Sequence, residues 1–238
     1  MSLVLGLLAW LVFAAACALL SRRPRPGDPF IGLLYQLVRV YAWVRHKLEV
    51  RGVTDDPRHN GGADGGGLII VCNHTAGIDP SLVQAACEFE IRWMMAKDMM
   101  IEQFEWAWEW LAIIPVDRNS NRDTSAAREA IRHVLAGGVV GVFPEGRIEN
   151  PPRMLLPFKA GVGLLVLKTG APVLPVWIDG TPIAARAWGS LFLTSRSRVT
   201  FGPVMRFAKG GGSAEITASI QRWFEEASGW AVAPGNEG

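Results

Sequence analysis

The sequence predicts an α/β fold with a mainly parallel sheet flanked by helices, preceded by an N-terminal membrane helix and an amphipathic interfacial helix. Short apolar runs alternate with helix-like stretches over most of the chain, which is typical of an α/β layer structure. The first twenty residues contain no charged side chain. Half of the 238 residues are hydrophobic and only 19% are charged, which argues against disorder.

Residues 1–20 form an apolar run of the length expected for a membrane helix, because twenty helical residues span about 30 Å. Arg22, Arg23 and Arg25 follow it, and by the positive-inside rule they place the rest of the chain in the cytoplasm. A cleaved signal peptide is the competing interpretation, but no Lys or Arg precedes the apolar run. We therefore expect an anchor in the inner (cytoplasmic) membrane.

Residues 30–47 have a helical, broadly apolar pattern after a break rich in Pro and Gly. The polar residues of this helix fall on one narrow stripe, which contains Gly32, Gln36, Arg39, His46 and Lys47. Such a helix lies among lipid headgroups with its basic side chains reaching anionic lipid, or it packs into the core. The pattern leaves both interpretations open.

The remainder predicts six strands and five helices. The strands are expected at 68–72, 91–95, 112–116, 139–143, 173–178 and 198–202, and the helices near 80–89, 99–110, 123–136, 158–169 and 214–228. We divide the chain into four parts. Residues 1–27 are the membrane anchor, and residues 28–60 contain the amphipathic helix, the first strand and a linker. Residues 61–228 are the catalytic domain, and residues 229–238 are a tail.

Charge and cysteine usage exclude some classes of function. The net charge is only +2, so no basic surplus exists to bind a polyanion, and nucleic acid is not an expected partner. The three cysteines show no CxxC spacing, so neither a disulfide framework nor a zinc site is expected.

The first candidate catalytic pair is His74 and Asp79. His74 follows the predicted strand 68–72, and a tight turn would bring the Asp79 carboxylate to its imidazole. A carboxylate on one ring nitrogen fixes the tautomer and stabilises the imidazolium that forms during general-base catalysis. Asp79 also precedes a proline, as an ordinary helix N-cap does, so a structural role stays open. The same spacing recurs at His59 and Asp64 in a glycine-rich loop, which we attribute to chance.

Two further strand ends carry charged residues. Arg118 follows one of them, although an ordinary surface arginine is the competing interpretation. The strand at 139–143 runs into Pro-Glu-Gly-Arg, which exposes Glu145 and Arg147 at the carboxyl edge of the sheet. Ligands bind at that edge in open α/β sheets.

These motifs, taken in order over roughly residues 48–180, resemble the glycerophospholipid acyltransferase family, whose best-known members are the 1-acylglycerol-3-phosphate acyltransferases. The four family motifs correspond to Asn73-His74 with Asp79, to Arg118 at a strand end, to Phe143-Pro144-Glu145-Gly146, and to the proline-rich strand 171–176. Lys97 and the pair Phe158-Lys159 occupy places where the family tends to carry a lysine and an FK pair.

The resemblance implies transfer of a fatty acyl group from acyl-CoA or acyl carrier protein to a lysophospholipid, most directly 1-acylglycerol-3-phosphate, giving phosphatidate. His74 would be the general base, oriented by Asp79. No covalent intermediate, metal or bound cofactor is implied, and the bilayer itself would be a partner.

The resemblance also implies how the acceptor would be held. Arg118 and Arg147, with Lys97 as a weaker third, would bind its phosphate, and Glu145 would position these cations or the headgroup. Backbone N–H groups near Gly146 are candidates for stabilising the oxyanion.

The third motif departs from the family pattern, since Arg147-Ile148 replaces the usual Thr-Arg. This leaves the reaction type intact and opens the choice of acceptor, with lysophosphatidylethanolamine or a lyso-aminolipid as the alternative. A thioesterase and a non-catalytic membrane-lipid binding module are the alternatives from other classes.

The stretch 99–111 is rich in tryptophan. We expect Phe104 and Trp108 to pack into the core, and Trp106 and Trp110 to contact lipid or line the acyl-chain groove.

Overall fold

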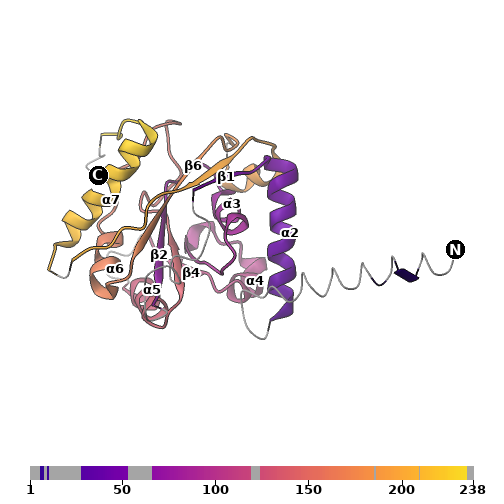
Figure 1. Ribbon diagram of the computed structural model, residues 1–238, viewed down its shortest axis with the longest axis horizontal. Helices are drawn as coiled ribbons and strands as arrows, with labels where there is room; N and C mark the ends of the chain where they lie inside the picture. The colour runs from indigo at the N-terminus through magenta and orange to yellow at the C-terminus, as the bar shows by residue number, and fades with distance from the viewer. Residues whose placement is uncertain are drawn as a thin grey trace.

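The computed structural model describes residues 6–7, 10, 28–52, 66–118, 124–184, 186–208 and 210–234. Their centre is a seven-stranded sheet with helices on both faces (Figure 1). Across the sheet the strands are β1 (Glu49–Arg51), β7 (Arg198–Phe201), β6 (Val173–Asp179), β2 (Leu68–Cys72), β5 (Val139–Val142), β3 (Arg92–Ala96) and β4 (Ile114–Val116). All neighbouring pairs are parallel except β6 and β7, so the predicted mainly parallel sheet is confirmed.

Two hydrophobic cores lie on opposite faces of this sheet. The helices α2 (Pro29–His46) and α3 (Asp79–Ala86) cover one face, and α5 (Ser125–Leu135), α6 (Gly161–Thr169) and α7 (Ser213–Ser228) cover the other (Figure 1). Successive residues of β2 alternate between the two cores, and all five are fully buried. A short apolar run buried on both faces is typical of a central parallel strand. Because such a run is easy to recognise in a sequence, the predicted bounds 68–72 agree with those of β2.

The predicted helix at 99–110 is shorter than expected. Two 3₁₀ turns, η1 (Lys97–Met99) and η2 (Glu102–Phe104), precede α4 (Glu105–Trp110). Phe104 is 48% exposed, so its predicted core position is wrong, whereas Trp106 is exposed as expected. The indole of Trp110 donates to Asp28 Oδ2, which ties α4 to the start of α2.

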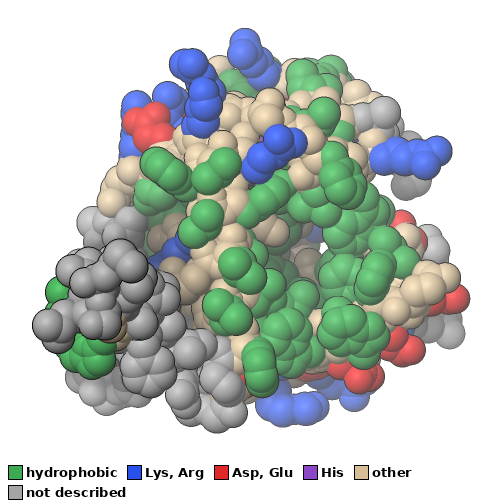
Figure 2. Space-filling view, turned by 90° about the vertical axis from the view of Figure 1, so that its right-hand side faces the viewer, with side chains coloured by type: hydrophobic (Ala, Val, Ile, Leu, Met, Phe, Trp, Pro, Cys, Tyr) green, Lys and Arg blue, Asp and Glu red, His purple; other side chains and the backbone are tan. Residues whose placement is uncertain are grey.

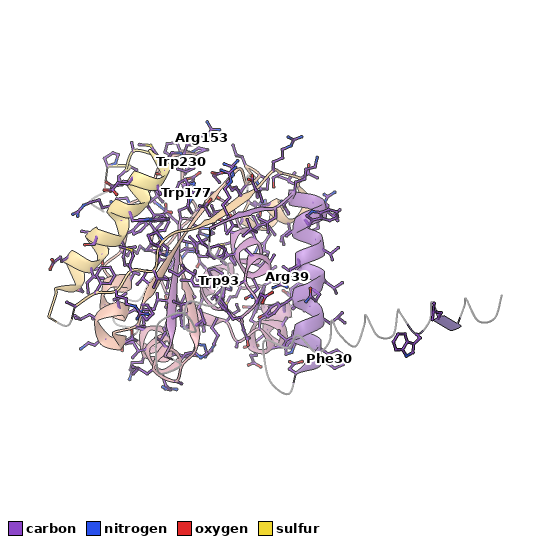
Figure 3. All side chains as sticks on the ribbon, viewed as in Figure 1. Phe30, Arg39, Trp93, Arg153, Trp177 and Trp230 are labelled. Atoms are coloured by element: carbon purple, nitrogen blue, oxygen red, sulfur yellow. The ribbon has the colours of Figure 1, made fainter. Side chains whose placement is uncertain are left out.

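Helix α2 turns Arg39 and His46 of its polar stripe toward the protein and presents apolar side chains outward. Arg39 donates to the carbonyls of Ala85 and Cys87, and it points from α2 toward the sheet (Figure 3). His46 is fully buried and contacts the Ser195 hydroxyl. Of the basic residues on the polar stripe, Arg39 and His46 are therefore held inside the protein, whereas Lys47 is exposed. The outward side chains are apolar and between 44% and 72% exposed: Phe30, Leu33, Leu37, Val40, Trp43 and Val44.

The predicted membrane helix at 1–20 lies outside the described residues except at Gly6, Leu7 and Trp10. In the part of the chain that is described, no helix combines the length and the hydropathy needed to cross a bilayer.

Candidate active site

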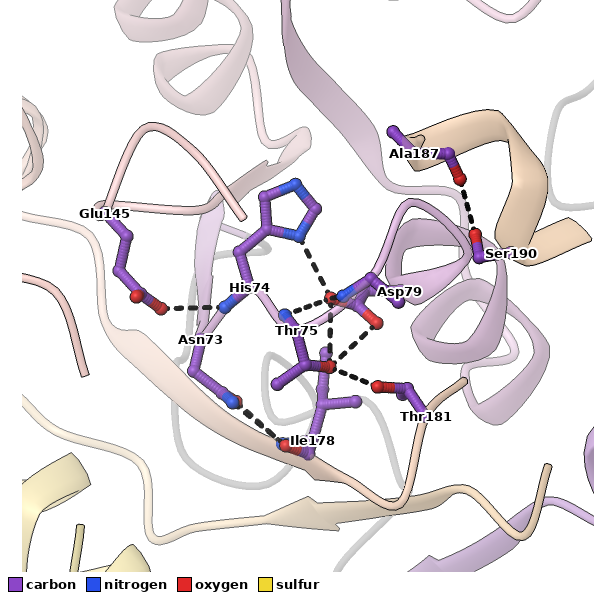
Figure 4. A network of polar contacts seen from close by, with 10 residues as sticks. Asn73, His74, Thr75, Asp79, Glu145, Ile178, Thr181, Ala187 and Ser190 are labelled. Atoms are coloured by element: carbon purple, nitrogen blue, oxygen red, sulfur yellow. Dashed lines mark hydrogen bonds and ion pairs between the residues drawn. The ribbon is translucent and has the colours of Figure 1, made fainter. Parts of the chain in front are cut away.

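The turn between β2 and α3 brings His74 and Asp79 together. His74 Nδ1 lies 2.9 Å from Asp79 Oδ2 (Figure 4). The Asp79 side chain is fully buried, while the His74 side chain keeps 17% of its surface exposed. Because the carboxylate accepts from Nδ1, the neutral ring carries its lone pair on Nε2. The pair therefore has the arrangement of an oriented general base.

The rest of the Asp79 carboxylate is held by the same turn. It accepts from the backbone N–H of Thr75 at 2.7 Å and of Ala76 at 2.8 Å, and from the Thr75 hydroxyl at 3.2 Å. These donors satisfy the hydrogen-bonding capacity of the buried carboxylate. The N-cap residue of α3 is Ile78, so the Asp79 side chain serves the turn and His74 rather than the helix terminus.

A hydroxyl pair connects this turn to the end of β6. Thr75 Oγ1 lies 2.7 Å from Thr181 Oγ1 (Figure 4). Gly77 completes the turn because a Cβ there would lie 2.3 Å from the Ala187 carbonyl oxygen. The turn is thus packed closely against the segment that follows β6.

Glu145 braces the backbone of His74. One carboxylate oxygen accepts from the N–H of His74 at 2.7 Å, and the other accepts from the N–H of Leu156 at 2.9 Å. The Glu149 N–H donates to the His74 carbonyl at 2.8 Å, so the loop after β5 holds His74 on both sides. Glu145 is only 3% exposed, so its carboxyl group lies against the backbone of His74 and is almost withdrawn from the surface.

Two carboxyl groups of this loop have raised pKa values. Burial raises the pKa of Glu145 to about 8, and it outweighs the two N–H donors, which act in the opposite direction. Burial also raises the pKa of Glu149 to about 7, and the nearby charge of Asp79 acts in the same direction. The site therefore holds two carboxyl groups that change charge close to neutral pH.

Gly146 adopts a left-handed conformation, with φ at +72°. Its own N–H donates to the Phe143 carbonyl, so this N–H is not available to an oxyanion. The Lys159 side chain lies over it instead, because a Cβ on Gly146 would be 2.7 Å from Nζ. Lys159 thus adds a cation to the turn of the third motif.

The predicted phosphate ligands lie along the same carboxyl edge. Arg147 is exposed directly after the turn, and Lys97 is exposed directly after β3. Arg118 follows β4 and forms a loose ion pair with Asp98 at 3.8 Å. Because β4 is the third strand from β2, Arg118 starts about 14 Å to the side of His74. The His74–Asp79 pair is therefore separate from the three cations along this edge. We call these cations, Arg118, Arg147 and Lys97, the cationic rim.

Among the side chains that the structure describes, no group of three or more His, Cys, Asp or Glu is placed to hold a metal ion.

The comparisons with known proteins agree with this geometry. Residues 47–179, more than half of the chain, match the family model described as Acyltransferase. The chain belongs to the acyltransferase family. The match contains both members of the His74–Asp79 pair and the third motif, and the resemblance to the glycerophospholipid acyltransferases is confirmed.

Two curated members of the acyltransferase family are similar to this chain. A chloroplastic 1-acyl-sn-glycerol-3-phosphate acyltransferase of Brassica napus is 25% identical over 164 residues, which are 68% of this chain and 45% of the relative. The 1-acyl-sn-glycerol-3-phosphate acyltransferase of Borreliella burgdorferi is 31% identical over 150 residues, which are 60% of this chain and 56% of the relative. The chain spans about half the length of the curated relatives that it matches.

A solved acyltransferase has the same fold. The crystal structure of the 1-acyl-sn-glycerophosphate (LPA) acyltransferase PlsC from Thermotoga maritima superposes with a TM-score of 0.63 and 21% identity. The superposition covers 85% of this chain and 82% of that chain, so the likeness extends over most of both chains.

Proposed function

We propose that this protein transfers a fatty acyl group from acyl-CoA or acyl carrier protein to the free hydroxyl of a lysophospholipid. The observation that carries the proposal is the buried Asp79 carboxylate holding His74 Nδ1 at 2.9 Å. Two relatives named 1-acyl-sn-glycerol-3-phosphate acyltransferases favour that lipid as acceptor and phosphatidate as product.

In the proposed reaction, His74 Nε2 takes the proton of the acceptor hydroxyl as the oxygen attacks the thioester carbonyl. The new C–O bond forms, the C–S bond breaks, and the departing thiolate receives the proton from the imidazolium. Asp79 stabilises that imidazolium, and a positioned base of this kind contributes about 10²–10⁴-fold in rate. The thioester is already reactive, so the direct transfer requires no acyl-enzyme intermediate.

The acceptor phosphate is assigned to the cationic rim. Arg118 and Arg147 present planar guanidinium groups that suit phosphate oxygens, and Lys97 lies between them in the order of the sheet. Lys159 lies against Gly146, in the turn that follows β5, and is our candidate for stabilising the developing oxyanion.

We further propose that the outward face of α2 contacts the cytoplasmic surface of the inner membrane. Six large apolar side chains of α2 are exposed on it, while Arg39 is bonded inward. Figure 2 shows this side of the molecule, where hydrophobic side chains cover a broad area with Lys and Arg at its upper border. An exposed apolar area of this kind marks an interaction site, and the acceptor and product are both bilayer lipids.

Product identification tests the proposal. The purified chain is added to vesicles that contain a mixture of lysolipids, with labelled acyl-CoA or labelled acyl carrier protein as donor. Labelled phosphatidate as the main product is the expected result. Release of carrier without any acylated lipid would indicate a thioesterase. Binding to vesicles without turnover of either donor would reject the catalytic proposal in favour of a lipid-binding module.

The acceptor alternative comes from one observation, Arg147-Ile148 in place of Thr-Arg, of which Arg147 is exposed. If a lysophosphatidylethanolamine or a lyso-aminolipid is acylated in preference to lysophosphatidate, the reaction class stands and our leading acceptor is rejected. The same mixed-lysolipid assay gives this answer.

A further inference from the structure

A column of three stacked rings begins at the imidazole of His74. The imidazole of His74 stacks on the ring of Phe143, with centroids 4.2 Å apart and planes inclined by 25°. Phe143 in turn stacks on the indole of Trp93 at 5.1 Å and 17°. The two contacts join the segments that directly follow β2 and β5 to the beginning of β3.

The lower part of the column is fixed by packing. Trp93 is 6% exposed and lies over β5 at Gly141, where a Cβ would be only 2.4 Å from its ring. Its indole N–H has no hydrogen-bond partner among the described residues, so no polar contact identified there sets its orientation. The missing side chain at Gly141 therefore lets Trp93 lie flat, and Trp93 supports Phe143 from below.

We propose that Phe143 is a positioning residue of the acyl transfer, whose π face stabilises the imidazolium of His74, with Trp93 holding Phe143 in place. A cation over the face of an aromatic ring within about 6 Å is attracted by the ring quadrupole, more strongly where water is excluded. Asp79 contacts the edge of the imidazole and Phe143 contacts its face, so the two act from different directions. The inference rests on the proposed general-base role of His74.

The test compares Phe143→Leu, which keeps an apolar side chain without a π face, with Phe143→Tyr, which restores the ring. For Phe143→Leu we expect kcat/KM on the pH-independent plateau to fall about fivefold. We also expect the acidic limb of the kcat/KM profile to move to lower pH by about half a unit, because His74 becomes a weaker base. Phe143→Tyr should restore both values.

Matched controls separate this role from packing. Phe201→Leu removes a ring of a core residue in β7, and Trp177→Leu removes an indole that is 6% exposed like Trp93 but belongs to the other core (Figure 3). Both should leave the acidic limb in place, whereas Trp93→Leu should shift it in the direction of Phe143→Leu. An acidic limb that stays unchanged in Phe143→Leu, whatever the loss of activity, would overturn the inference. Full activity of His74→Ala would instead reject the proposed function.

Discussion

Asp79 illustrates how single residues of this site depend on their neighbours. A buried carboxylate is costly unless several donors satisfy it, and here the turn supplies two N–H groups and one hydroxyl besides the imidazole. The hydroxyl belongs to Thr75, which also contacts Thr181. The orientation of the catalytic carboxylate is thus linked to the segment after β6.

Replacing Thr75 tests this link. Thr75→Val keeps the shape of the side chain but removes the donor to Asp79, so kcat/KM for acyl transfer is expected to fall about tenfold. Thr75→Ser retains the hydroxyl and should remain close to wild type. Steady-state kinetics with saturating donor gives both values, and equal activity of the two variants would show that the hydroxyl contributes nothing.

Glu145 gives a prediction about stability and pH. Its pKa is about 8 in the folded protein against an ordinary value of 4.5, so between these values the folded state binds more protons than the unfolded state. The contribution of Glu145 is therefore fully present below about pH 4.5 and is lost as the pH rises through about 8. We expect the free energy of unfolding to fall from pH 5 to pH 8.5 more in wild type than in Glu145→Gln. Urea unfolding at the two pH values measures this, and identical decreases would contradict the assignment.

The sequence predicted some residues of the site and missed others for a physical reason. His74 and Asp79 lie in one turn after a recognisable strand, so local spacing was sufficient. Thr181 reaches the site only by a contact over more than a hundred positions of the chain. Glu145 was assigned to the substrate because a strand end predicts where the backbone lies, not that both carboxylate oxygens turn back to the N–H groups of His74 and Leu156.

Among the elements, α2 shows what periodicity leaves undecided. A stripe of polar residues on an apolar helix predicts that the helix has a polar and an apolar face. It does not predict which of the two faces packs against the rest of the protein. In the structure the polar face is bonded inward through Arg39 and His46, and the apolar face points outward. Because Arg39 and His46 are bonded inward, the apolar face is exposed. We propose that this exposed face contacts the bilayer.

Vesicle binding tests the proposed role of α2. Leu37 and Val40 are 58% and 59% exposed, and placing a charge on this face opposes insertion into lipid. We expect the double variant Leu37→Glu, Val40→Glu to bind vesicles more weakly than wild type and to lose activity on vesicle-borne acceptor. Leu135→Glu on α5, at a residue that is 64% exposed beyond the other face of the sheet, is the matched control. Equal vesicle binding of all three proteins would show that α2 does not contact lipid; it would then face another partner or another part of this chain.

At the scale of the whole molecule, the sheet order assembles the site. The carboxyl ends of β2, β5, β3 and β4 are neighbours, although they are dispersed over about seventy residues of the chain, from Cys72 to Val142. The alternation of strands and helices predicted the layers and the common edge. It did not predict the strand order or the antiparallel β6–β7 pair, because these depend on long-range packing that no local pattern records.

The most direct test of the account is the acyl-transfer rate of His74→Ala. Purified wild type, His74→Ala and the control His133→Gln are compared on vesicles that contain lysophosphatidate and acyl-CoA or acyl carrier protein, with both phosphatidate and released carrier quantified. His133 lies on α5, and α5 covers the face of the sheet opposite to the one that α3 covers. We predict that the rate of phosphatidate formation falls at least about 10²-fold in His74→Ala and changes little in His133→Gln. Phosphatidate formation by His74→Ala at the wild-type rate would contradict it.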